Sequence, residues 1–227
     1  MKILIIAAHP DDEVLGCGAT MAKHANNGDE VHVVILVEGI TSRDGKRSCE
    51  KRNTDLSQLA KSANKANSIL GVKSLTLHNF PDNRMDSLYM LDVIKVIEGH
   101  ISRRRPDTVY THHAGDINID HRIINTAVMT ACRPQPESPI KKILFFEVPS
   151  STGWHVPDPA QSFIPNWFEE VSGTLSAKLK ALHAYKSEMK PWPHARSLKA
   201  VEYLAKWRGS SVGMEAAEAF SLGRVRG

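Results

Sequence analysis

The sequence predicts a Rossmann-like, three-layer α/β fold, in which helices cover both faces of a mostly parallel sheet. Short apolar runs of strand length alternate with longer segments of helical spacing, and glycines close the first two helical segments. The 227 residues, 41% of them hydrophobic, suffice to bury a core. We expect one domain over 1–227. Its core is expected in about 1–150, and 151–227 is expected to complete the site or an oligomer interface.

The predicted strands share an apolar run bounded by turn-forming residues, and they cover 3–7, 30–37, 73–80, 106–113 and 141–149. The predicted helices share apolar residues at helical spacing, and they cover 14–27, 50–70, 88–102, 119–132, 175–189 and 198–207. The stretch 149–165 is rich in Pro, Ser and Gly. Because so long an irregular segment inside a compact domain is usually functional, we expect an active-site or interface loop there.

Composition excludes several classes of protein. No apolar run approaches the about 20 residues that a membrane-spanning helix needs. Carboxylates follow the first apolar run where a secretory signal would have a cleavage site, so we expect a cytoplasmic protein. The three cysteines, Cys17, Cys49 and Cys132, lie far apart, which argues against a disulfide framework or a thiolate zinc site. The net charge of +4 favours anionic small molecules, but scattered basic residues predict no nucleic-acid partner.

Two clusters of polar residues follow two of the predicted strands. The first lies in "AHPDDE", directly after strand 3–7, and contains His9, Asp11, Asp12 and Glu13. The second follows strand 106–113 and contains His112, His113, Asp116, Asn118, Asp120 and His121. In a doubly wound sheet the carboxyl ends of these strands can lie side by side, so the two clusters can share one crevice.

Histidines and carboxylates without nearby thiols favour zinc or another divalent metal, held by three protein ligands with one open position. His9 and Asp12 are three residues apart at a strand-to-helix turn, so both can face one ion, and His121 is the third candidate. The competing interpretation is that "HPDDE" only caps a helix and that His121 is a surface residue at a helix start. Capping does not require the His-Pro before the carboxylates, so we favour the metal site.

The motif "AHPDDE", followed far downstream by "DH", resembles the PIG-L/LmbE family of zinc-dependent N-deacetylases, which remove an acetyl group from amino-sugar conjugates. The likeness covers the order of elements over about the first 150 residues, and the late "GMEAAEAF" is similar to the family's C-terminal segment. The resemblance implies His9, Asp12 and His121 as zinc ligands, metal-bound water as nucleophile and Asp11 as general base. It also implies an N-acetylated amino-sugar substrate on a nucleotide, lipid or other carrier, and a homo-oligomer such as a trimer or hexamer.

The second motif departs from the family at Asn118. Many members have H-x-D-H there, whereas this chain has "NIDH". Asparagine can donate a hydrogen bond to an oxyanion but cannot shuttle a proton. We therefore expect Asp11 to act as base and then, once protonated, as acid, with His112 or His113 as the alternative proton source.

Further residues complete the predicted site. Asp120 is expected to hydrogen-bond a ligating imidazole, and Glu13 to orient the site. Candidates for substrate contact occupy loops after strands or between helices, and they are Asp82, Arg84, Arg43 and His194. Each also has a plainer interpretation. Asp82 and Arg84 could belong to a turn, Arg43 to a solvated surface, and His194 to a Pro-rich connection between helices. In "WPHARS", either His194 or Arg196 could complete the site or an oligomer contact.

Other functions compete with that of an N-deacetylase. The nearest is a metal-dependent amidase acting on a thiol or antibiotic conjugate, because the same chemistry cleaves other amides. A nucleotide-binding protein without catalysis is disfavoured, because no G-x-G-x-x-G follows the first strand and carboxylates there would repel phosphate. A structural metal site is disfavoured as well, because it would need four ligands where three good candidates are present.

Overall fold

The computed structural model describes residues 1–39 and 49–226. Its strands form one sheet in the order β3-β2-β1-β4-β5-β7-β6. The strands are β1 (Lys2–Ala7), β2 (Glu30–Val37), β3 (Ser74–Phe80), β4 (Thr108–His112), β5 (Lys142–Phe146), β6 (Trp167–Glu170) and β7 (Ala217–Val225). The helices are α1 (Asp12–Asn26), α2 (Cys49–Ile69), α3 (Met90–Arg104), α4 (Ile119–Ala131), α5 (Leu175–Ala184) and α6 (Leu198–Ser210). Short 3-10 turns occupy Met85–Ser87 and Thr152–Trp154.

The strand order reverses between β1 and β4. The chain runs outward from β1 through β2 to β3, then returns to place β4 and β5 on the other side of β1. All these pairs are parallel. The carboxyl ends of β1 and β4 therefore lie side by side, which is where a doubly wound sheet forms its ligand crevice.

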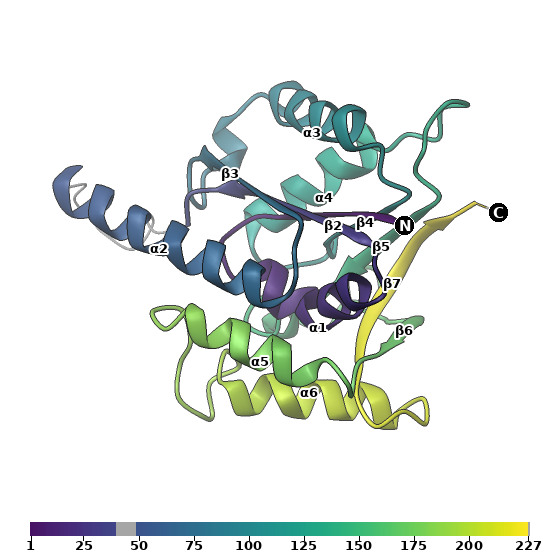
Figure 1. Ribbon diagram of the computed structural model, residues 1–227. Helices are drawn as coiled ribbons and strands as arrows, with labels where there is room; N and C mark the ends of the chain where they lie inside the picture. Colours follow the sequence, from purple (N-terminus) through teal and green to yellow (C-terminus); the bar gives the residue numbers. More distant parts are fainter. Residues whose placement is uncertain (40–48, 227) are drawn as a thin grey trace.

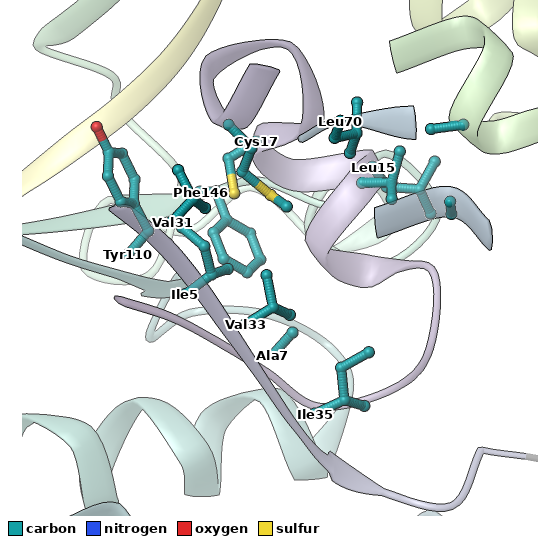
Figure 2. Packing of buried hydrophobic residues seen from close by; sticks show 14 of the residues in the cluster. Ile5, Ala7, Leu15, Cys17, Val31, Val33, Ile35, Leu70, Tyr110 and Phe146 are labelled. Carbon is teal, nitrogen blue, oxygen red and sulfur yellow. The ribbon is translucent and has the colours of Figure 1, made fainter. Parts of the chain in front are cut away.

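Helices cover both faces of the sheet (Figure 1), with α3 and α4 on one face and α1, α2, α5 and α6 on the other. The cause lies in the strands, whose side chains alternate between the faces although nearly all are apolar. On β1, Ile3 and Ile5 pack in the cluster under α1, whereas Leu4 and Ile6 pack on the opposite side. Figure 2 shows the first cluster, with Ile5 and Phe146 close to Cys17 of α1. Full burial of such a side chain contributes about 1.5–3 kcal/mol.

The predicted fold class is confirmed, and the five strands expected from the sequence are present within a few residues of their expected bounds. Two strands were missed: β7 pairs antiparallel with β5 and with β6, so the sheet is mixed at this end. The sequence of β7 contains Glu and Gly residues that are depleted in strands. A Cβ at Gly223 would lie 2.5 Å from the Phe145 ring, so a larger residue there would displace that ring.

The predicted helix 175–189 is shorter in the structure. Helix α5 ends at Ala184, and the chain turns at Tyr185, whose hydroxyl donates to Glu13 at 2.7 Å. The apolar pattern continues past this turn because Tyr185 is itself buried in the core. Among the described residues, no helix is long and apolar enough to cross a membrane.

A buried ion pair joins the C-terminal part to α1. Helix α1 is kinked at Cys17, whose φ of −147° is not helical. Just beyond the kink, the backbone N–H groups of Ala19 and Thr20 both donate to the Glu218 carboxylate on β7. Lys178 of α5 lies 2.6 Å from the same carboxylate, and both side chains are almost fully buried. This network fixes α1, which begins at the site.

Candidate active site

The candidate site lies at the carboxyl ends of β1 and β4. His9 follows β1, and Asp12 begins α1 three residues later. Asp11 between them has a φ of 115°, a left-handed conformation that non-glycine residues rarely adopt. Such strain persists where the surrounding structure imposes it, typically at functional sites. His121 comes from the first turn of α4, which follows the β4 loop.

The structure brings His9, Asp12 and His121 together. Asp12 Oδ2 lies 3.1 Å from His9 Nδ1 and 3.1 Å from His121 Nε2. One candidate ligand atom from each of the three residues lies within 4.8 Å of the others. One carboxylate and two imidazoles are a donor set typical of catalytic zinc sites.

The other ring nitrogens of both histidines face carboxylates. His9 Nε2 lies 3.0 Å from Asp120 Oδ2 and 3.2 Å from Asp82 Oδ1. His121 Nδ1 lies 3.1 Å from Asp116 Oδ2. Carboxylates placed in this way fix the tautomer and orientation of metal-binding imidazoles. His9, Asp82 and Asp120 also form a second group whose ligand atoms are close enough to hold an ion.

The pKa values of the three candidate ligands respond to one another. Burial alone would lower the pKa of His121, but Asp12 and Asp116 outweigh it and raise the pKa to about 9. Burial also opposes the charged form of His9, yet hydrogen bonds with Asp12 and Asp120 raise its pKa well above the usual value. The pKa of Asp12 is held well below its usual value by the two histidines, against the effect of burial. The Asp12 carboxylate and the two imidazoles thus stabilise one another's charged forms in a buried pocket.

Two buried oxygens suggest that a cation completes this site. Asp11 Oδ1 and Asp12 Oδ1 accept no hydrogen bond from any residue that the structure describes. A buried carboxylate oxygen without a partner is costly, so it indicates a missing ligand. The residues present therefore suit a divalent metal.

Asp11 is buried beside the candidate ligands but faces a different partner. Its Oδ2 accepts a hydrogen bond from Arg196 Nη1 at 2.7 Å. Burial raises the pKa of the Asp11 carboxyl well above its usual value, although Arg196 opposes this effect. A buried carboxylate of raised pKa at a cleft is typical of a proton-transfer group.

Glu13 lies beneath Asp11 and holds its backbone. Glu13 Oε2 accepts the Asp11 N–H at 3.0 Å, which supports the left-handed conformation. Its Oε1 accepts hydrogen bonds from Tyr185 at 2.7 Å and from Asn67 at 2.9 Å. Burial raises the pKa of Glu13, although these hydrogen bonds oppose the shift. Its contacts are those of a side chain that orients the site.

Asn118 is the N-cap of α4. Its side-chain oxygen accepts the Asp120 N–H at 2.8 Å, which is the bond that makes asparagine a favoured cap. Its amide nitrogen donates to Asn83 Oδ1 at 3.2 Å. The Asp120 carboxylate accepts from the N–H groups of Asn83 and Met85, so the loop after β3 is tied to α4.

His112 and His113 point away from each other. His112 is fully buried, and its Nε2 accepts the Ala8 N–H at 2.8 Å, joining the ends of β4 and β1. Burial lowers its pKa well below the usual value, so its ring is neutral. His113 Nε2 lies 2.8 Å from the carbonyl oxygen of Gln161 in the predicted loop 149–165. Neither residue is among those that line the two cavities at the site.

Two cavities meet at the site. One of about 100 Å³ is lined by His9, Asp11, Asp82, Asn83, Asn118 and Arg196, among others. The other, about 490 Å³, is lined by residues that include His121, Ser151, Trp154, Lys190, His194 and Arg196. The ring of Trp154, which is 56% exposed, meets His194 edge to face. The loop 149–165 and the segment before α6 therefore both contribute walls.

Some predicted substrate residues lie elsewhere. Arg84 is exposed and lines neither cavity. Arg43 lies outside the described residues. Sequence reasoning missed Asn67 and Tyr185, because nothing in α2 or at the end of α5 marks one polar side chain as directed inward.

The fold and the cluster of histidines and carboxylates at the switch point of the sheet define a class: Rossmann-like α/β proteins with a candidate metal centre. Comparison with known families identifies the family within this class. Residues 4–132 match the family described as PIG-L: GlcNAc-PI de-N-acetylase, and the chain belongs to this family of deacetylases.

Relatives agree with the assignment. The chain is 36% identical over 193 residues to the uncharacterized deacetylase YaiS of Escherichia coli K12, covering 82% of this chain and 90% of that protein. It is 27% identical over 202 residues to the diacetylchitobiose deacetylase of Thermococcus kodakarensis, covering 82% and 70%.

A solved structure extends the fold beyond deacetylases. GalB, the 4-carboxy-2-hydroxymuconate hydratase of Pseudomonas putida KT2440, matches with a TM-score of 0.76 at 21% identity, covering 100% of this chain and 97% of that one. Such a likeness shows the fold alone. The reaction must therefore be argued from the site.

Proposed function

We propose that this protein is a zinc-dependent hydrolase that removes an N-acetyl group from an amino-sugar conjugate. The observation that carries the proposal is the pairing of two adjacent buried carboxylates with different partners. Asp12 lies between two imidazoles, whereas Asp11 lies beside the cavities with one oxygen that accepts no hydrogen bond from the described residues. Metal-dependent amide hydrolysis needs one group that binds the metal and a second group that transfers the proton.

His9, Asp12 and His121 would hold the metal, and the orphaned Asp12 oxygen supports this assignment. When bound, a divalent metal supplies Lewis acidity, which lowers the pKa of water and polarises a carbonyl group. Asp116 and Asp120 would fix the imidazole orientations through the ring nitrogens that face away from Asp12. Zinc is proposed because two imidazoles and one carboxylate suit it, and other divalent transition metals suit the same set.

Asp11 would accept the proton of the attacking water and return it to the departing amine. The Asp11 carboxyl has a raised pKa, which suits a group that must hold a proton between these two steps. Asn118 cannot relay a proton, and its side-chain oxygen is engaged in the helix cap. Its amide nitrogen donates one N–H to Asn83, and the second N–H is left to donate to the substrate.

The substrate proposal rests on the relatives and on the larger cavity. The family description and the Thermococcus relative both refer to glucosamine-type sugars. The cavity of about 490 Å³ offers an exposed indole, Trp154, beside Lys190 and His194. An aromatic face with polar groups around it suits a sugar ring, and the two side chains that can carry positive charge favour a carrier with anionic groups.

The test is incubation of zinc-loaded protein with N-acetylated sugars, sugar nucleotides and lipid-linked sugars, followed by mass spectrometry. We expect one or more members to lose a single acetyl group, with the loss abolished in His121→Ala and retained in His155→Ala, whose ring contacts its neighbour's backbone. Loss only from acylated thiol or antibiotic conjugates would favour the amidase alternative. Hydration without acetate release would favour chemistry of the kind named for GalB.

Two further expectations belong to the proposal. We propose a cytoplasmic location, because Cys17 and Cys132 are both buried free thiols, as expected in a reducing compartment. We also propose a homo-oligomer, such as a trimer or hexamer, and light scattering of the purified protein would test it.

A further inference from the structure

Arg196 joins the C-terminal segment to Asp11. It lies in the connection between α5 and α6, far from "AHPDDE" in sequence. Its Nη1 donates to Asp11 Oδ2 at 2.7 Å, and its Nε donates to Ser150 Oγ at 2.6 Å. Glu188 Oε2 lies 3.6 Å from the same Nη1. The guanidinium is therefore held from three sides while its side chain is only 20% exposed.

The two oxygens of Asp11 consequently have different surroundings. Oδ2 is occupied by Arg196, whereas Oδ1 is buried and accepts no hydrogen bond from the described residues. Without the guanidinium, the plane of the carboxylate could rotate about the Cβ–Cγ bond, because this terminal torsion is soft and broad. The planar, charged donor group of arginine holds that plane at one angle, with one oxygen engaged and the other left for the reaction.

We propose that Arg196 is a positioning residue that engages Asp11 Oδ2 and so reserves Oδ1 for proton transfer. This inference rests on the proposed role of Asp11. Arg196 acts through Asp11, and the polar partners of its guanidinium among the described residues are Asp11, Ser150 and Glu188 and not the three candidate metal ligands. The proposal gives the C-terminal segment a part in the reaction, because the base is oriented by a residue outside the region 4–132 that matches the family.

Arg208 provides a matched control. It forms a two-point contact with Glu147, with distances of 2.8 Å from Nε and 2.8 Å from Nη2, and its side chain is 21% exposed. It lies on α6, outside both cavities of the site. Arg208→Ala therefore removes a similar ion pair without touching Asp11, and any general effect on folding should be common to both variants.

The kinetic experiment compares Arg196→Ala, Arg196→Lys and Arg208→Ala. We expect kcat of Arg196→Ala to fall about 10- to 100-fold, as for other residues that orient a reacting group, with KM and zinc content unchanged. Added guanidinium ion should restore part of kcat in Arg196→Ala but not affect Arg208→Ala, and Arg196→Lys should be intermediate. A wild-type kcat in Arg196→Ala, or a loss confined to KM, would overturn the proposal, the latter because it indicates direct substrate binding.

Crystal structures of the wild type and Arg196→Ala separate this inference from the proposed activity. We expect the plane of the Asp11 carboxylate to hold one angle in the wild type and to rotate away from it, or to become disordered, in the variant. An unchanged Asp11 orientation in Arg196→Ala would overturn the positioning role even if the wild type is an active deacetylase. A changed orientation would support it even if the substrate screen fails.

Discussion

Asp116 Oδ2 lies 3.1 Å from Nδ1 of His121, on the side of the ring opposite to Asp12. The same oxygen accepts hydrogen bonds from Thr152 at 2.6 Å and from Ser151 at 3.0 Å, so the carboxylate is itself fixed. When a metal takes the place of the proton on Nε2, these contacts would keep the remaining ring proton on Nδ1, facing Asp116.

Asp116→Asn tests this arrangement. We expect zinc affinity to fall about 10- to 100-fold, because the imidazole loses its orienting carboxylate. Competition with a chromophoric chelator measures the change. Thermal unfolding of both proteins without metal serves as the check on folding, and equal zinc affinities would contradict the assigned role.

Metal removal is expected to lower stability as well as activity. A ligand that binds only the folded state stabilises it by about 2.7 kcal/mol at a free concentration of 100 Kd. Zinc added to chelated wild type should therefore raise the melting temperature and restore activity. His121→Ala should show no such shift, and a zinc-dependent shift of equal size in that variant would contradict the ligand set.

The pH dependence of stability should reflect His100. Burial, together with Arg104, lowers the pKa of His100 from 6.5 to about 4. Between these values the unfolded chain binds more protons than the folded one, so the free energy of unfolding falls as pH decreases from 6.5 to 4. Urea unfolding across this range, in the presence of chelator, should show a weaker dependence for His100→Gln than for wild type. Identical dependences would contradict the shift.

The buried pair Lys178 and Glu218 should matter for stability far more than a surface pair. Removing one partner of a buried ion pair costs about 3–5 kcal/mol, because the other charge is left uncompensated. Lys178→Met should therefore unfold at much lower denaturant. The control is Lys206→Met, because Lys206 forms an exposed pair with Glu202 worth about 0–1 kcal/mol. Similar losses in the two variants would refute this account of α1.

Local sequence determines the elements that carry the predicted chemistry. The run before "AHPDDE" is apolar on both faces, so its strand was predictable, and the switch point follows from the alternation of strands and helices. Residues that contact distant parts of the chain were harder to predict from the sequence. Glu218 and Tyr185 reach α1 and Glu13 from segments about 200 and 170 residues away, as their sequence numbers show. The sequence "WPHARS" marked Arg196 only as a candidate for the site or an oligomer contact, because its contact with Asp11 depends on tertiary packing.

Asn118 illustrates a residue whose identity has a local explanation. The sequence showed asparagine where many family members have histidine, and the structure shows an N-cap that asparagine fills well. His112 and His113 could not be distinguished from sequence, because the direction of each ring depends on the twist and end of β4. One joins two strand ends, and the other contacts the segment at Gln161. Gly115 permits that approach, because a Cβ there would lie 1.9 Å from the Gln161 oxygen.

The central claim is that Asp12 binds the metal whereas Asp11 transfers the proton, and Asp11→Asn tests it most directly. Turnover and zinc content should be measured in the same samples at saturating metal, with the best substrate from the screen. We expect full zinc occupancy and a kcat reduced about 10²- to 10⁴-fold, because proton transfer is lost while the ligand set is intact. Substantial turnover at full zinc occupancy would contradict the claim, because Asp11 would then not be the base.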